Sequence, residues 1–367
     1  MRVFLDASAA AKAARTGVGQ YVARLVPALL AADPGLELLL GVRLSRWKRR
    51  RHVLEVGGPD ARRARLRWFP SELAFLRTGG AAVVHGPDAR VVGGGGAQVV
   101  TIHDLFSLKT DAWARASFRE AKLERYAEAA RHAARLLCVS EATAQDVEKL
   151  LEVPRAKIAV TPLGVGPTFQ PLEPAACAPT LARLGVKPPY LLFVGLAQPR
   201  KNLEAVATVF GRLAARIDDL TLVLAGEDGY PEGRLPALLK ETNATDRVRL
   251  LGYVAPADLP SLYAAAGCLL FPSRDEGFGL PALEAMACGC PVVASTAGAL
   301  PEVVGEGGLL FAPDAFDDLE DAVAHVLDDP EFREHHVVRG LARAKAFSWE
   351  RTARLTLDAY LAAAHGG

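Results

Sequence analysis

Two glutamates separated by seven residues are the side chains best placed for chemistry in this sequence. Glu276 falls in a glycine-rich turn after an apolar strand pattern, and Glu284 falls about a turn and a half inside the helix expected to follow. The amides and dipole of a helix N-terminus attract a phosphate, and a carboxylate further along can accept hydrogen bonds from ribose hydroxyls. The spacing therefore predicts that both acids face one phosphorylated ligand. The other residues that we place beside this ligand are Gly277, Phe278, Gly279 and Leu280.

The neighbours of Glu284 bear on a plainer alternative, in which both acids are solvated residues at a helix start. Leu283, Ala285 and Met286 are all apolar, and a charge in such company needs a partner or a ligand. The sequence therefore favours a binding role for the two acids.

Adjacent cations occur in another candidate loop, where Arg200 and Lys201 follow the apolar strand pattern at 190–195. Arginine offers a planar fork of donors and lysine a compact charge, and together they suit the oxygens of a diphosphate. Asn202 is expected to cap the helix that follows. Because the carboxyl ends of parallel strands share one edge of a sheet, we expect the cations to lie opposite the helix end at Gly279. The alternative is a pair of solvated surface charges.

A pair of glycines near the N-terminus, Gly17 and Gly19, lies between a strand pattern and a helix pattern. Val22 stands where a dinucleotide-binding turn has its third glycine, so a nicotinamide or flavin site is disfavoured. Glycines here still let the backbone approach an anionic ligand at the helix N-terminus. A tight turn without a ligand is the alternative.

Short apolar runs alternate with longer amphipathic runs along the chain, which is typical of βα units and a parallel sheet. Expected strands span 2–6, 36–42, 82–85, 99–103, 136–140, 157–161, 190–195, 220–226, 248–251, 268–272 and 291–294. Expected helices span 18–31, 112–134, 141–151, 202–217, 235–242, 257–266, 280–288 and the chain beyond 317. The stretch 162–189, rich in proline, glycine and small residues, is expected to link two doubly wound α/β domains with a cleft between them.

Charge separates the two halves of the chain. The 367 residues carry 43 Lys and Arg against 42 Asp and Glu, a net charge of +1. Residues 1–170 hold 26 basic and 16 acidic side chains, whereas the remainder holds 17 basic and 26 acidic ones. This asymmetry indicates two domains with different tasks, and the neutral total argues against a protein coated for nucleic acid.

Topology and cysteine usage indicate a cytoplasmic protein. No apolar run reaches the ~18 residues of a transmembrane helix, and Asp6 comes too early for a secretion signal. Five cysteines in a chain of this length, with none in a Cys-x-x-Cys pair, predict buried reduced thiols and no disulfide framework.

Taken together, these motifs resemble the retaining sugar-nucleotide glycosyltransferases of family GT4, which have the GT-B fold. The most specific match is the pair Glu276 and Glu284, about seventy residues after the Pro-Arg-Lys-Asn at 199–202. The resemblance implies two Rossmann-like domains facing a central cleft: an acceptor-side domain at 1–167, a donor-side domain at 168–349, and a last helix at about 350–367 that packs back on the first. Weaker matches occur in family order at Thr16–Tyr21, Thr101–Asp104, Val139–Glu141, Thr161–Val165, Ala225–Glu227, Gly252–Tyr253, Ala287–Pro291 and Gly298–Gly308.

The resemblance also implies roles for single residues in transferring a hexose from a nucleoside diphosphate. Arg200 and Lys201 would neutralise the diphosphate in place of a metal ion, and the sequence contains no Asp-x-Asp. Glu276 would contact the transferred sugar and Glu284 the ribose, while His103 would bond a sugar hydroxyl near the anomeric carbon. Further donor contacts would come from Gly17, Gly19, Gly252, Tyr253, Gly277, Phe278, Gly279 and Leu280.

The resemblance is nearest to mannosyl- or rhamnosyl-transferring members, so GDP-mannose is the first expected donor. The acceptor would be a glycan or a lipid-linked sugar, configuration should be retained, and no cofactor or metal is expected. Two alternatives keep the fold: a sugar-nucleotide 2-epimerase and a non-catalytic sugar-nucleotide-binding protein. The spaced glutamates and the cation loop disfavour the first, and the intact candidate residues disfavour the second.

Nine basic residues and only two acids fall within Arg46–Arg67, with Trp47 among them and Trp68 directly after them. Basic side chains interleaved with aromatics suit an anionic membrane surface, to which each charge contributes about 1 kcal/mol. Membrane binding would place the protein at the inner face of the membrane. A solvated charge run and a site for an anionic acceptor are the alternatives, and nucleic acid is disfavoured because no binding motif accompanies the stretch.

Overall fold

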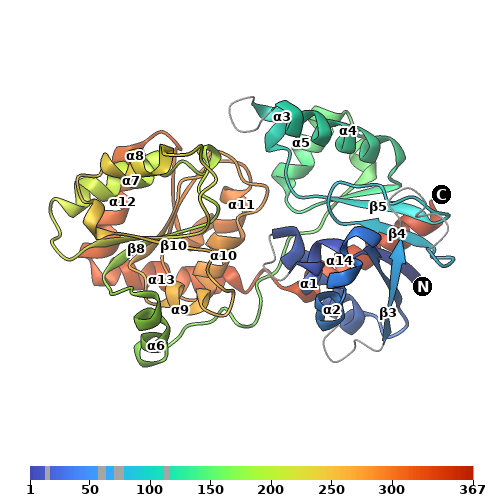
Figure 1. Ribbon diagram of the computed structural model, residues 1–367, viewed down its shortest axis with the longest axis horizontal. Helices are drawn as coiled ribbons and strands as arrows, with labels where there is room; N and C mark the ends of the chain where they lie inside the picture. Colours follow the sequence, from blue (N-terminus) through green and yellow to red (C-terminus); the bar gives the residue numbers. More distant parts are fainter. Residues whose placement is uncertain (13–16, 57–62, 70–77, 111–115, 367) are drawn as a thin grey trace. The chain divides into compact units, whose positions relative to one another are not determined.

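The computed structural model describes residues 1–12, 17–56, 63–69, 78–110 and 116–366, and the chain divides into two compact units (Figure 1). The first unit comprises Met1–Gly164 together with Phe347–Gly367, and the second comprises Val165–Ala346. The sequence predicted these divisions after residues 167 and 349. The chain thus passes from the first unit into the second and returns once.

The first unit contains a parallel sheet with the strand order β3-β2-β1-β4-β5-β6-β7. Its central strands are continuous apolar runs, as in Val3-Phe4-Leu5, because helices cover both faces of such a sheet. The order reverses between β1 and β4, and ligands of open α/β sheets bind at the carboxyl ends of the strands at such a point. The strands are β1 (Arg2–Asp6), β2 (Glu37–Arg43), β3 (Ala64–Phe69), β4 (Val83–Gly86), β5 (Ala97–Ile102), β6 (Arg135–Cys138) and β7 (Ile158–Val160).

The terminal helix α14 (Trp349–His365) belongs to the first unit because it packs against α1 (Gly17–Ala32), as Figure 1 shows. The hydroxyl of Thr352 in α14 also donates a hydrogen bond to the carbonyl oxygen of Pro162, 2.6 Å away. The other helices of this unit are α2 (Arg51–Leu54), α3 (Phe106–Lys109), α4 (Ala116–His132) and α5 (Glu141–Leu151), with short 3-10 helices η1 (Ser8–Ala11), η2 (Leu44–Arg49) and η6 (Arg155–Lys157).

The second unit repeats the same topology, with a parallel sheet in the order β10-β9-β8-β11-β12-β13. Its point of reversal lies between β8 and β11, so the loops that follow these two strands lie side by side at the carboxyl edge. The strands are β8 (Tyr190–Val194), β9 (Thr221–Ala225), β10 (Val248–Gly252), β11 (Cys268–Phe271), β12 (Val292–Ser295) and β13 (Leu309–Phe311).

Helices cover both faces of the second sheet. Figure 1 shows α7, α8 and α12 on one side and α9, α10 and α13 on the other. The amphipathic helices α7 and α12 pack against each other over a core that includes Phe193 and Phe210. The helices are α6 (Pro174–Leu184), α7 (Leu203–Ala214), α8 (Arg234–Lys240), α9 (Leu259–Ala264), α10 (Leu280–Ala287), α11 (Leu300–Val304), α12 (Phe316–Asp328) and α13 (Pro330–Ala344), with 3-10 helices η7 (Pro199–Lys201), η8 (Thr245–Arg247) and η9 (Gly305–Gly307).

The structure differs from the expected elements at several places. The expected linker 162–189 contains the helix α6, which begins at Pro174 and ends before Gly185 in a left-handed conformation, an ordinary helix stop. The strands β3 and β13 were not expected. β3 alternates exposed arginines with inward side chains, a pattern that the charge of the stretch concealed, and β13 has only three residues. Of the expected helix 112–134, the part before residue 116 lies outside the described residues.

All five cysteines lie in the described part of the chain, where they are buried and form no disulfide, as the sequence predicted. Among the described residues, we find no helix that is both long and apolar enough to cross a membrane.

Candidate functional site

The loops after β8 and β11 bring the expected cations and the first glutamate together in the second unit. The Lys201 ammonium donates a hydrogen bond to Oε1 of Glu276, and a guanidinium nitrogen of Arg200 lies 3.2 Å from Oε2. The three residues are 7%, 9% and 8% exposed for Lys201, Glu276 and Arg200, so this is a buried ion cluster and not a set of solvated charges. The sequence predicted that the two cations would meet the diphosphate and that Glu276 would meet the sugar. In the structure these three side chains contact one another.

The two cations control the ionisation of Glu276. Burial alone would raise the pKa of this carboxyl, but the charges of Lys201 and Arg200 outweigh burial and lower it to about 2. Glu276 is therefore an anion at neutral pH. Both cations contact this one carboxylate, Lys201 at Oε1 and Arg200 at Oε2.

Backbone contacts lock the two loops in register. The guanidinium of Arg200 donates to the carbonyl oxygen of Asp275, and the amide of Arg274 donates in return to the carbonyl oxygen of Arg200, 2.8 Å away. The Lys201 ammonium lies 4.8 Å from the ring centre of Phe271, the last residue of β11. The ion cluster is therefore fixed by the sheet beneath it.

A glycine in the neighbouring loop allows the backbone to close around Glu276. A Cβ at Gly298 would lie 2.3 Å from the carbonyl oxygen of Glu276, and the backbone φ of +56° also favours glycine. That carbonyl accepts a hydrogen bond from the amide of Ala299 at 2.9 Å. Any larger residue at 298 would push the Glu276 segment away from its place.

Glu284 lies in the second turn of α10, where the sequence placed it. Its Oε2 accepts a hydrogen bond from the hydroxyl of Tyr263 in α9, at 3.0 Å. Gly279, which precedes the helix, has a φ of +100°, and a Cβ there would lie 2.6 Å from a methyl carbon of Leu300. The turn into α10 therefore requires glycine at this position.

The remaining donor-site candidates of the second unit lie in the same loops or one strand away. Phe278 is buried, whereas Gly277 and Leu280 are partly exposed. Gly252 ends the edge strand β10, and Tyr253 beside it is 47% exposed. The structure thus places all of these candidates at the carboxyl edge of the second sheet.

A third loop at this edge is tied to the other two through Asn202 and Arg274. The Asn202 side chain donates to the carbonyl oxygen of Pro313 at 3.0 Å and accepts from Arg274 at 3.2 Å, while Arg274 also pairs with Asp314. Asn202 directly precedes α7, but its side chain does not cap the helix, contrary to expectation. Its left-handed backbone, with φ of 54°, turns the amide toward Pro313 and Arg274 instead.

The candidates of the first unit lie at the carboxyl edge of its own sheet. His103 follows β5, is partly buried, and its Nε2 lies 2.9 Å from the carbonyl oxygen of Pro87. A carbonyl can only accept, so Nε2 carries the proton, and burial lowers the pKa of the ring, which favours the neutral form. Gly17 begins α1 with open space where a Cβ would lie, and Gly19 is buried in the same helix. Residue 16 of this motif lies outside the described residues.

A buried hydrogen-bond chain lies behind His103. Nδ1 of His85 is 2.6 Å from the Tyr360 hydroxyl, and its Nε2 is 2.7 Å from the hydroxyl of Thr101. That hydroxyl lies 3.1 Å from the hydroxyl of Tyr21, whose ring meets the His103 ring edge-on at 4.9 Å. The chain thus connects α14 to the side chain expected to meet the sugar.

The sequence did not predict Tyr263, Arg274 or His85 as site residues. Two of them could have been found from their position in the sequence, since Arg274 adjoins the Glu276 turn and His85 ends an expected strand. Tyr263 could not, because one tyrosine in an apolar helix pattern looks like any other core residue.

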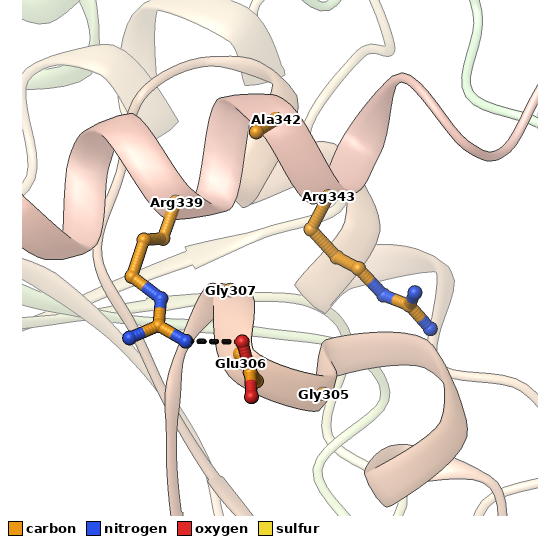
Figure 2. A pocket seen from close by; sticks show the side chains of 6 residues that line it. All are labelled: Gly305, Glu306, Gly307, Arg339, Ala342 and Arg343. Carbon is orange, nitrogen blue, oxygen red and sulfur yellow. Dashed lines mark hydrogen bonds and ion pairs between the residues drawn. The ribbon is translucent and has the colours of Figure 1, made fainter.

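A separate cavity of about 450 Å³ lies beside η9 and α13 (Figure 2). Arg339 pairs with Glu306 there, and Arg343 donates to the carbonyl oxygens of Val303 and Glu302 at the end of α11. Because η9 directly precedes β13, this cavity lies toward the amino end of that strand, away from the loops described above. It does not include any of the candidate residues.

Family models match both units of the chain. Residues 15–169 match the model described as "Glycosyltransferase Family 4", and residues 182–340 match "Glycosyl transferases group 1". Solved structures with the same arrangement include a sucrose-phosphate synthase from Thermosynechococcus elongatus, with a TM-score of 0.76 and 23% identity over 98% of both chains. Anabaena HepE in complex with UDP and glucose has a TM-score of 0.73 and 20% identity, over 97% of this chain and 98% of that one. These likenesses show the GT-B fold.

Relatives in sequence are glycosyltransferases. The O-antigen chain mannosyltransferase B of Escherichia coli is 38% identical over 227 residues, 61% of this chain and 60% of that protein. A D-inositol 3-phosphate glycosyltransferase of Actinosynnema mirum is 32% identical over 71% of this chain and 66% of that protein. The match thus spans less than two thirds of the length of each relative. With both family models in their order along the chain, the protein belongs to the GT4 family of glycosyltransferases.

Proposed function

We propose that the protein transfers mannose from a nucleoside diphosphate mannose, with GDP-mannose as the first candidate, to a glycan or lipid-linked acceptor. The observation that carries the proposal is the buried cluster of Arg200, Lys201 and Glu276 at the point where the second sheet reverses its order. The likeness to the E. coli O-antigen mannosyltransferase supports mannose as the sugar and a polysaccharide as the product.

In this proposal each candidate of the second unit meets one part of the donor. The cations Arg200 and Lys201 pair with the diphosphate, and the amides at Phe278 and Gly279 bind one of its phosphates. Glu276 accepts from hydroxyls of the transferred sugar, and Glu284 accepts from the ribose. The burial of both cations beside Glu276, at the carboxyl edge of the sheet, supports this division.

The mechanism follows from where charge develops. Breaking the bond between the sugar and the phosphate leaves an oxocarbenium-like centre and a diphosphate anion, so cations at the diphosphate act most strongly in the transition state. We propose that Arg200 and Lys201 serve this purpose without a metal ion and that the configuration at the anomeric carbon is retained. Turnover is then expected to persist in EDTA, and an EDTA-sensitive enzyme that is restored by Mg²⁺ or Mn²⁺ would contradict the metal-free part.

His103 is proposed to accept a hydrogen bond from a hydroxyl of the transferred sugar. A neutral ring that carries its proton on Nε2 has Nδ1 as its acceptor. A neutral acceptor orients the sugar without adding positive charge beside a developing oxocarbenium centre. Gly17 and Gly19 are proposed to contact the same donor through the backbone at the start of α1.

The basic stretch is proposed to bind the anionic inner face of the membrane, where lipid-linked acceptors would lie. The structure narrows the cations available for this role. Arg46 donates to the carbonyl oxygen of Ser8, and Arg63 donates to those of Leu30 and Asp33. Arg50 likewise donates to the carbonyl oxygen of Trp47. The exposed residues that carry the proposal are Leu44, Lys48, Arg49, Arg51 and Arg67.

Vesicles test this surface directly. We expect the protein to co-sediment with phosphatidylserine-containing vesicles at low salt and to be released as salt rises. A variant with Lys48, Arg49 and Arg51 changed to Ser should stay in the supernatant, whereas a triple change of the exposed Arg183, Lys187 and Lys240 in the second unit should not. Equal sedimentation of both variants would contradict the assignment.

The donor is tested by thermal shift with GDP, UDP, ADP and dTDP, since a ligand that binds only the folded state raises its melting temperature. GDP should give the largest shift. Product analysis with GDP-mannose and a mannosyl acceptor should then show an α-linked product if configuration is retained. A larger shift with UDP would make a UDP-sugar the first candidate donor in place of GDP-mannose. The absence of a shift with any nucleotide would contradict the whole proposal.

A further inference from the structure

Tyr263 is a buried side chain that the roles above leave unused. It lies near the end of the short helix α9, is 0% exposed, and donates its hydroxyl hydrogen bond to Oε2 of Glu284 at 3.0 Å. Glu284 itself is only partly buried. The phenol therefore approaches this carboxylate from the protein interior.

The direction of this hydrogen bond is fixed by the ionisation of the phenol. Burial raises the pKa of Tyr263 well above its ordinary value, and the charge of Glu284 adds to the shift. Tyr263 therefore keeps its proton at neutral pH and donates it to the carboxylate. A hydrogen bond to an ionised acceptor is among the stronger ones, and this bond orients one oxygen of Glu284.

A second buried tyrosine holds α9 in place. The hydroxyl of Tyr190, at the start of β8, donates to the carbonyl oxygen of Leu262 at 2.6 Å. Leu262 directly precedes Tyr263, and the ring of Phe169 meets the Tyr263 ring at 6.1 Å. The position of Glu284 is thus connected to the central sheet through two successive phenol hydrogen bonds.

We propose that Tyr263 is a positioning residue for ribose recognition: its hydroxyl orients the Glu284 carboxylate so that the acid can accept hydrogen bonds from the ribose hydroxyls of the donor. This inference rests on the proposed function, which assigns the ribose to Glu284. If the inference is correct, Tyr263 and Glu284 together, and not Glu284 alone, discriminate between ribonucleotides and deoxynucleotides.

The test compares ribose and dideoxyribose ligands on matched variants. Isothermal titration calorimetry gives the Kd of GDP and UDP and of their 2′,3′-dideoxy forms, so the result does not depend on the base. Tyr263→Phe should weaken binding of the ribonucleotide about tenfold and leave the Kd of its dideoxy form unchanged, because only the former uses the oriented carboxylate. Glu284→Gln should reduce the same discrimination.

Tyr126→Phe is the matched control, since it removes a buried hydroxyl that bonds the backbone carbonyl oxygen of Asp104 in the first unit and not Glu284. It should lower the melting temperature about as much as Tyr263→Phe and keep the wild-type ratio of the two Kd values. A wild-type ratio in Tyr263→Phe would overturn the positioning role alone. Equal Kd values for the ribose and dideoxy forms in the wild-type protein would contradict the ribose contact assigned to Glu284. If the protein bound neither GDP nor UDP, the proposed function itself would be contradicted.

Discussion

The carboxyl edges of the two sheets share a topology but differ in chemistry. In the second unit the loops at the point of reversal bury two cations against Glu276, and their charges keep its pKa near 2. In the first unit the equivalent edge buries His85 among hydroxyl groups, and burial lowers the pKa of its ring to about 3, so the ring is neutral. Around Glu276 the edge is thus held by ion pairs, and we call it the ionic edge. Around His85 the edge is held by uncharged hydrogen bonds, and we call it the neutral edge; the Asp6–Arg43 ion pair lies at the ends of β1 and β2.

The difference matches the tasks proposed for the two units. A diphosphate needs charge, and a cluster that keeps cations close together must carry a carboxylate to limit their repulsion while it is empty. A sugar hydroxyl needs an oriented, uncharged partner, and His103 is proposed for this role. The ring of Tyr21, whose hydroxyl contacts that of Thr101, packs edge-on against the His103 ring and helps to orient it. The same fold therefore supplies an ionic and a neutral site at equivalent positions.

The largest expected effect comes from removing one cation of the ionic edge. Lys201→Ala should lower turnover of GDP-mannose by about 10²- to 10³-fold, since the group acts where negative charge develops in the transition state. The measurement is kcat with purified protein whose melting temperature is within a few degrees of the wild type. Lys187→Ala, an exposed lysine of the same unit, is the control. Turnover that is unchanged in Lys201→Ala would contradict the role of the ionic edge.

Removing the anion of the cluster should mainly lower the stability of the protein. Glu276→Gln leaves two buried cations without their carboxylate, which should cost about 3 kcal/mol of unfolding free energy without ligand. GDP should then raise the melting temperature of the variant more than that of the wild type, because the diphosphate supplies the missing negative charge. A smaller GDP shift in the variant would show that Glu276 supports the nucleotide in another way.

The two edges should also respond differently to acid. Between pH 6.5 and about 3 the unfolded chain protonates His85 while the folded chain does not. The free energy of unfolding therefore decreases as the pH is lowered through this window. His103, whose pKa is also lowered by burial, acts in the same direction. Glu276 contributes stability above pH 4.5 that is lost only as pH falls toward 2. Near pH 5 the first unit should therefore weaken while the second holds.

Tryptophan fluorescence can follow this effect, because all four tryptophans lie in segments of the first unit. Urea unfolding followed by fluorescence should give about 2 kcal/mol less unfolding free energy at pH 5 than at pH 7. In His85→Gln most of this pH dependence should disappear, although the variant is less stable at pH 7. A pH dependence that persists in full would place the titrating group elsewhere.

The sequence predicted the ionic edge better than the neutral one. Arg200, Lys201 and Glu276 stand next to glycines and prolines in loops, where buried charge is unusual and easily noticed. The pairing among them was not expected, because residues 75 positions apart meet only once β8 and β11 are neighbours. Their individual roles with the donor remain predictions.

The neutral edge depends on contacts that sequence spacing does not reveal. His85 meets Tyr360 from 275 positions away, and a tyrosine inside an amphipathic helix looks like ordinary core. The same holds for Tyr263 beside Glu284. Strand and helix patterns were predicted closely where apolar runs were long, and β3 was missed because the arginines on its exposed face looked like a charge run.

The smallest expected effect comes from the rim of the ionic edge. Asp314 pairs with Arg274, but its side chain is 78% exposed, and an exposed ion pair is worth less than about 1 kcal/mol. Asp314→Asn should change kcat and KM for GDP-mannose by less than about twofold, because Asn202 still ties Arg274 to the Pro313 carbonyl oxygen. If this variant lost turnover as Lys201→Ala does, the decisive property would be the geometry of the three loops and not the burial of charge.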